Sequence, residues 1–222
     1  MQRRCPYISP GGITPNQNRG KGSIVEMFEK PKGEKYHTRT IEVNTYEYDE
    51  GRLAVEGCLT DRRWREFHLA TGEKKPPGIL HQMIIQLLVS KTTLEIEDLE
   101  LEMPAVPRSE CLEARDSLSA VKGSRIAAGF TAKVKAMAGN GRGCSHLAAL
   151  LTAMGPSAIQ GYASYKLQKS PQFISSMLNM LADTCWTWRA DGPLIRFLKE
   201  KIEAAKTGKP APAGNAKHNL DN

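Results

Sequence analysis

Apolar and polar residues alternate along residues 40–48 and 52–61, and Asp49-Glu50-Gly51 between them has the composition of a tight turn. The alternation returns along residues 80–89 and 94–103, after a loop rich in Gly, Pro and Lys at residues 70–78. A period of two is typical of strands that bury one face. The pattern therefore predicts two antiparallel β-hairpins.

After the second hairpin the apolar residues recur every three or four positions. This spacing predicts helices over residues 109–122, 129–139, 145–165, 171–181 and 194–205. We expect Ser109 to cap the first of them, and Pro156 to break the third because proline lacks an N–H donor. The prediction is an α+β fold: a small antiparallel sheet from two hairpins with helices packed on one face.

The two ends of the chain differ in composition from its body. They are rich in Gly, Pro, Asn and Lys and have little apolar periodicity. Such segments bury too little apolar surface to offset the entropy lost on ordering. We predict a flexible N-terminal segment (1–38), a single α+β domain (39–205) and a disordered tail (206–222).

The net charge of +7 is concentrated near the ends. Residues 1–40 carry eight Lys or Arg and three Glu, whereas the 158 residues between 41 and 198 hold eighteen basic and eighteen acidic side chains. Binding to nucleic acid needs a concentrated basic face, so this distribution argues against a nucleic-acid partner. No apolar run approaches the roughly 20 residues of a membrane span. We expect a cytoplasmic protein without a membrane partner.

Gly143-Cys144-Ser145-His146 places a thiol and an imidazole at the start of a predicted helix, where the backbone dipole favours a thiolate. Cys111 lies in the first turn of another predicted helix, and His81 lies where a predicted strand begins. Junctions of this kind can meet at one end of a sheet. Thiolates and imidazoles suit zinc or iron. We therefore predict a metal site formed by Cys111, Cys144, His146 and His81.

Two other functions remain open. In one, a cysteine acts as nucleophile without metal, a histidine as its base and an aspartate orients that base; the candidates are Cys144 or Cys111, His146 or His81, and Asp183 or Asp191. In the other, the protein binds or assembles partners without chemistry. The chain contains no phosphate loop, dinucleotide fingerprint or nucleophile elbow, so we expect no nucleotide cofactor.

Two further residues have simple structural interpretations. Cys58 lies within an apolar strand, so we expect it in the core. Asp61 ends that strand beside three arginines, and we expect it to pair locally with Arg62, Arg63 or Arg65.

Several runs in order resemble the family known as domain of unknown function 2889, over roughly residues 39–198. They are Asp61-Arg62-Arg63, Ile79-Leu80-His81-Gln82-Met83, Cys111, Gly143-Cys144-Ser145-His146-Leu147, and Cys185 with Arg189-Ala190-Asp191-Gly192-Pro193. The family is uncharacterised, so the resemblance brings no activity. Its members tend to belong to metabolic gene clusters, which implies small-molecule metabolism.

A second resemblance is to the iron–sulfur cluster scaffold (NifU-like) fold. It rests on residues 83–87, on Val121-Lys122-Gly123 and on Cys144-Ser145-His146-Leu147 followed by Ala158-Ile159-Gln160. It implies that Cys111 is the helix-opening cysteine and that Cys144 and His146 are the His/Cys pair in altered order. His81 falls near the first cysteine ligand, but Gln82 stands where that fold has an aspartate, which departs from cluster assembly.

The expected function is that of a zinc- or iron-binding accessory protein or enzyme in intracellular small-molecule metabolism, encoded with a catabolic or biosynthetic pathway. A small molecule or a partner enzyme would be its partner.

Overall fold

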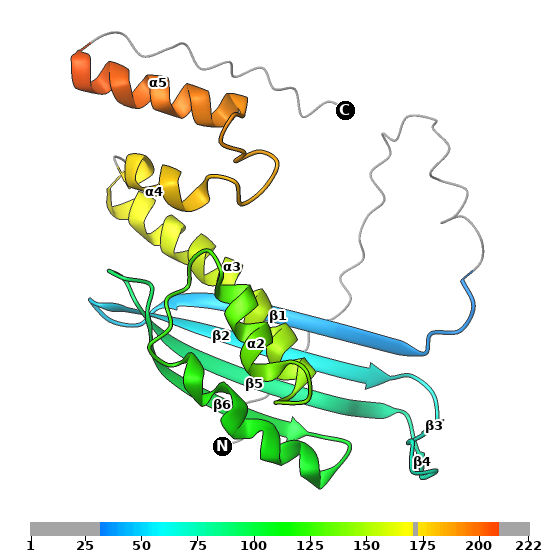
Figure 1. The fold of residues 1–222 in the computed structure, drawn as a ribbon. Coiled ribbons are helices and arrows are strands. Elements are labelled where there is room, and N and C mark those ends of the chain that lie inside the picture. Colours follow the sequence, from blue (N-terminus) through cyan, green and yellow to red (C-terminus); the bar gives the residue numbers. More distant parts are fainter. Residues whose placement is uncertain (1–31, 171–172, 209–222) are drawn as a thin grey trace. The chain divides into compact units, whose positions relative to one another are not determined.

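The computed structural model describes residues 32–170 and 173–208 (Figure 1). Most of the predicted flexible segment, residues 1–31, and residues 209–222 of the predicted tail lie outside the described residues. Contacts group the chain into two units, one ending at Ser157 and the other beginning at Ala158. Each unit is described by itself, and the single domain over 39–205 stays a prediction.

A four-stranded antiparallel sheet forms the first unit's main layer. Its strands are β1 (His37–Glu47), β2 (Arg52–Arg63), β5 (Gly78–Ser90) and β6 (Ile96–Ala105), which lie side by side in this order (Figure 1). The two predicted hairpins are therefore confirmed, and β2 joins β5 to make one sheet. The predicted loop between them contains a small two-stranded sheet, β3 (Phe67–His68) and β4 (Lys74–Lys75).

One face of the sheet holds the core. Alternate residues of the two central strands are almost completely buried there: Leu53, Val55, Leu59, Met83, Ile85 and Leu87. Gly57 continues this row, and its missing side chain lets helix α3 (Ser145–Lys169) approach the sheet closely. A Cβ on Gly57 would lie 2.6 Å from Sδ of Met154 and 3.0 Å from Cδ1 of Leu150. Helices packed on one face of the sheet confirm the predicted α+β fold.

The first helix has the predicted extent but a different type. Element η1 (Ser109–Val121) is a 3₁₀-helix, followed by α2 (Phe130–Ala138) as predicted. Ser109 is not its cap: Arg108 occupies that position, and no side chain makes a capping hydrogen bond. The Ser109 hydroxyl instead donates to the carboxylate of Glu110, which also pairs with Arg108. The Glu110 carboxylate thus engages the Ser109 hydroxyl, which could otherwise bond to the backbone at the start of the helix.

Helix α3 continues through Pro156, so the predicted break is wrong. Proline removes one intrahelical hydrogen bond, but burial of the preceding turns holds the helix in place. Leu150, Leu151 and Met154 are fully buried, and the carbonyl of Ser157 accepts a hydrogen bond from the hydroxyl of Thr45 on β1 (3.3 Å).

The second unit contains the end of α3, α4 (Ile174–Leu181) and α5 (Pro193–Thr207). Its small core is formed by Ala163, Met177 and Leu181, with Phe173 and Trp188 packed against them. The final helix includes two residues assigned to the predicted tail. Within the described ranges, no helix combines the length and the apolar character that crossing a bilayer requires.

Candidate metal centre

The register of the sheet places three polar residues side by side on neighbouring strands. Asp61, near the end of β2, lies opposite Arg39 on β1 and opposite His81 on β5. Asp61 continues the buried row of β2, and it is only 3% exposed. A buried carboxylate therefore stands where the alternation would place an apolar side chain, and it needs polar partners.

Two side chains of β1 supply these partners. Arg39 donates from Nε to Oδ1 (2.8 Å) and from Nη2 to Oδ2 (2.7 Å), and Nε2 of His37 lies 3.0 Å from Oδ1. Burial alone would raise the pKa of Asp61, but the hydrogen bonds from Arg39 and His37 hold that pKa well below its usual range. The carboxylate is therefore ionised at neutral pH.

Two imidazoles converge on the same carboxylate oxygen. Nδ1 of His81 and Nε2 of His146 each lie 3.2 Å from Oδ2 of Asp61, and the two rings stack with centroids 3.9 Å apart and planes 27° apart. One ligand atom from each of Asp61, His81 and His146 lies within 4.8 Å of the others. The three atoms are therefore close enough together to ligate a single ion.

His81 carries an unsatisfied buried atom in this cluster. Its Nδ1 is close to Oδ2, but the bond directions do not suit a hydrogen bond, and Nδ1 has no other partner. Burial and the neighbouring His146 lower the pKa of His81, although Asp61 opposes this effect. The neutral ring therefore keeps a lone pair, which a metal ion could use.

His146 enters the cluster from the start of α3, together with Cys144. Sγ of Cys144 lies 3.7 Å from Nδ1 of His146, the ring nitrogen that faces away from Asp61. Burial raises the pKa of the Cys144 thiol, but the hydrogen bond with His146 and the backbone N–H groups of Leu147 and His146 outweigh burial and lower it. The start of the helix thus favours a thiolate, as expected from the sequence.

The structure brings together two of the four predicted ligands. His81 and His146 join Asp61, and Cys144 contacts His146. Cys111 is half-buried in the first turn of η1 and is not a member of the group of convergent ligand atoms found among the described residues. Metal binding by Cys111 and Cys144 stays a prediction.

The structure also corrects the expectations for Asp61 and Cys58. Asp61 pairs with Arg39 across the strands and not with Arg62, Arg63 or Arg65, because it points into the core side of the sheet. Cys58 lies on the opposite side of β2, half-buried, and not in the core row.

The aspartates expected to orient a catalytic base belong to the second unit. Asp183 accepts a hydrogen bond from the backbone N–H of Ala190 (2.8 Å), and Asp191 lies 3.7 Å from Arg189. Cys185, in the same unit, is exposed.

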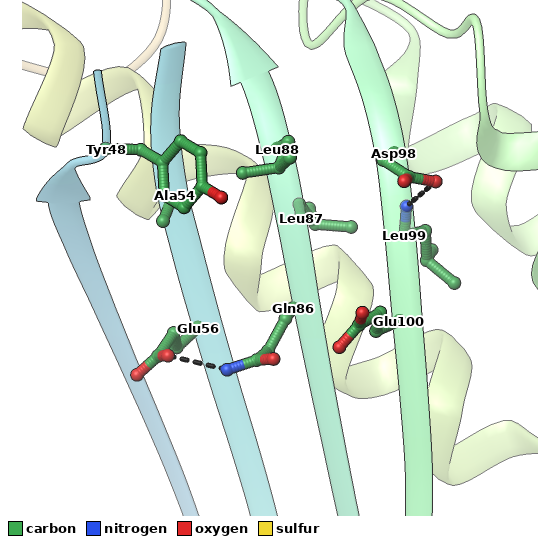
Figure 2. A pocket seen from close by; sticks show the side chains of 9 residues that line it. All are labelled: Tyr48, Ala54, Glu56, Gln86, Leu87, Leu88, Asp98, Leu99 and Glu100. Atoms are coloured by element: carbon green, nitrogen blue, oxygen red, sulfur yellow. Dashed lines mark hydrogen bonds between the residues drawn. The ribbon is translucent and has the colours of Figure 1, made fainter.

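The opposite face of the sheet has a pocket of about 240 Å³ (Figure 2). Two of its three acidic residues have partners: Glu56 accepts from Gln86 (2.6 Å), and Asp98 accepts from the backbone N–H of Leu99 (3.0 Å) and from Lys122 (3.0 Å). The pocket has no imidazole or thiol among its lining residues. The candidate chemistry therefore lies on the helix-covered face.

Comparison with known proteins gives a family without an activity. Residues 37–160 match the family described as "Protein of unknown function (DUF2889)", and this region contains Asp61, His81, Cys144 and His146. No curated protein and no solved structure matches the chain. Nothing in these comparisons supports the resemblance to the iron–sulfur cluster scaffold. Since the match covers more than half of its length, the chain belongs to the DUF2889 family.

Proposed function

We propose that the protein binds a zinc or iron ion through Asp61, His81 and His146. The observation that carries the proposal is the convergence of their three ligand atoms, one of which, Nδ1 of the buried His81, has no hydrogen-bond partner. Buried polar atoms are rarely left unsatisfied, and an ion at this point would satisfy all three at once.

The ligand types favour these metals. Two imidazoles and one carboxylate are a common set for zinc and for non-haem Fe(II), and a set of only three protein ligands would leave coordination positions open for water or substrate. Structural zinc sites, in contrast, usually have four protein ligands. The proposed centre therefore suits an enzyme or metal-dependent accessory protein that acts on small molecules in the cytoplasm.

Cys144 has a supporting role in this proposal. When Nε2 of His146 binds an ion, Nδ1 carries the proton and donates to Sγ of Cys144. This hydrogen bond fixes the ring and its tautomer. The role differs from direct ligation by Cys144, and the two can be separated experimentally.

Metal analysis tests the proposal. Protein purified without a histidine tag and supplied with Zn(II), or with Fe(II) without oxygen, should hold about one ion per chain. Asp61→Asn, His81→Ala and His146→Ala should abolish binding, whereas Cys144→Ser should weaken it by about 10- to 100-fold.

Cys111→Ser is the matched control, and it should bind metal like the unmodified protein. Loss of the ion in Cys111→Ser would make Cys111 a ligand. Substoichiometric metal in the unmodified protein, unchanged by His81→Ala, would overturn the proposal.

A second candidate function has a specific observation in its favour. His146 lies between a thiol and a carboxylate: its Nδ1 is 3.7 Å from Sγ of Cys144, and its Nε2 is 3.2 Å from Oδ2 of Asp61. A Cys–His–Asp nucleophile relay has its groups in this order. In that case Cys144 of metal-free protein should react with iodoacetamide faster than Cys111, and Asp61→Asn should slow this reaction. Equal rates for the two cysteines would rule out the relay.

A further inference from the structure

The proposed centre has too little negative charge for a divalent ion. Asp61 supplies the one carboxylate among the three ligands, and Arg39 already neutralises it through two hydrogen bonds. His81 and His146 bind metal as neutral rings. A divalent ion would therefore leave two positive charges uncompensated beside the buried carboxylate, or one when Cys144, which contacts His146, is a thiolate. Such a site favours an anion at the open coordination positions.

Arg63 supplies a further cation on the same face of the sheet. It lies two residues after Asp61 on β2 and opposite His37, whose side chain reaches Asp61. Alternate residues of a strand share a face and lie about 6.6 Å apart. Arg63 is half-buried, and its guanidinium lies 5.9 Å from the ring centre of Phe67. Among the ion pairs of residues 32–170 and 173–208, none involves Arg63.

We infer that the centre binds a small organic dianion, a dicarboxylate, with one carboxylate on the metal and the other on Arg63. A guanidinium fork matches a carboxylate in two parallel hydrogen bonds, which selects this group over a neutral one. The inference rests on the proposed metal binding and adds the chemical class of the ligand that completes the centre.

Arg62 offers a matched control in the same strand. Its side chain lies on the opposite face, 5.7 Å from the ring centre of Trp64, whose indole N–H donates to Thr38 (2.8 Å). Removing the charge of Arg62 changes the net charge of the protein as much as removing that of Arg63. It should not affect a ligand on the helix-covered face.

Cobalt(II) is a suitable probe because its visible absorption reports changes in coordination. Co(II)-loaded protein is titrated with succinate and with acetate at constant ionic strength. Succinate should change the spectrum saturably, with at least tenfold higher affinity than acetate. Arg63→Gln should remove this advantage, Arg63→Lys should retain part of it, and Arg62→Gln should retain all of it. Co(II) affinity should be the same in all four proteins.

The outcomes separate this inference from the proposed function. Co(II) binding that depends on His81, combined with equal affinities for succinate and acetate, would overturn the dianion and leave the metal site intact. The same holds if Arg63→Gln and Arg63→Lys keep the full preference for succinate. If Co(II) does not bind, or binds equally to His81→Ala, the proposed function fails and the inference fails with it.

Discussion

Arg39 and Asp61 lie opposite each other on β1 and β2, and the guanidinium donates one hydrogen bond to each carboxylate oxygen. This geometry fixes the plane of the carboxylate, so that Oδ2 faces both imidazoles. The edge strand β1 thus determines how a residue of the central strand is presented to the centre.

The first prediction concerns the stability that this pair provides. Arg39→Gln should lower the free energy of unfolding by about 1–3 kcal/mol, because the buried carboxylate loses two charged hydrogen bonds. We expect a smaller loss of stability than for a fully buried ion pair, because the Arg39 side chain is 41% exposed and solvent screens its charge. Urea denaturation of metal-free protein measures it. A loss no larger than in Arg62→Gln would contradict the prediction.

The second prediction concerns His81 and pH. Burial and His146 lower the pKa of His81 in the folded protein, whereas the unfolded chain titrates near about 6.5. Below that pH the unfolded chain takes up a proton that the folded state resists, so the free energy of unfolding should decrease as the pH falls from about 7.5 to 5.5. Urea denaturation of metal-free protein should show a smaller decrease for His81→Gln. Parallel pH profiles would show that His81 does not contribute.

A third prediction is that Asp61 makes the stability of the protein depend on pH in a lower pH range, with Asp61→Asn as the control. Its pKa is lowered on folding, so its contribution is complete above the unfolded value of about 4 and is lost as the pH falls through the folded value. Below about pH 4 the unmodified protein should therefore lose stability faster than Asp61→Asn. The result is read from thermal unfolding between pH 5 and 2.5.

A further prediction tests the close contact between sheet and helix. Gly57→Ala should destabilise the protein by about 1–3 kcal/mol, because the new methyl group would overlap Met154 and Leu150. Gly78→Ala is the control, since a Cβ at Gly78 meets nothing within 4 Å. Equal melting temperatures for the two variants would mean that Met154 moves aside without cost.

A further prediction concerns Lys91, which bonds to the turn between β1 and β2 and is not one of the proposed metal ligands. Lys91 is 3% exposed, and its ammonium donates to Glu47 (2.9 Å) and to the backbone carbonyl of Asp49. Lys91→Ala should lower the free energy of unfolding by about 1–3 kcal/mol, because these bonds and the packing of the side-chain stem are lost. Metal content should not change. If it falls, the turn and the centre are coupled.

The sheet could be predicted from the sequence because its signal is local. The period of two in residues 52–61 and 80–89 reports burial of one face directly, and Gly51 marks the turn. The type of η1 and the continuity of α3 through Pro156 could not be predicted in this way. Both depend on tertiary packing and side-chain pairing, which override local propensity.

The centre could be predicted only in part, for a related reason. His81 and His146 lie at junctions and are recognisable from the sequence as metal-ligand types, whereas the arginines beside Asp61 in the sequence favour a local ion pair. The available signal was its position: Asp61 continues the row of Leu53, Val55 and Leu59, so a buried charge was required there. The identity of its partner Arg39 depends on strand register, which a single sequence does not specify.

The two imidazoles face Asp61 through different nitrogen atoms, Nδ1 in His81 and Nε2 in His146. An ion bound at both lone pairs leaves each ring its proton on the other nitrogen, so the two histidines must be opposite tautomers. Nitrogen-15 chemical shifts distinguish the two forms. Loading with diamagnetic zinc should therefore resolve two imidazole spin systems with inverted patterns, and this would identify each ligand atom without a substrate, a product or a known activity.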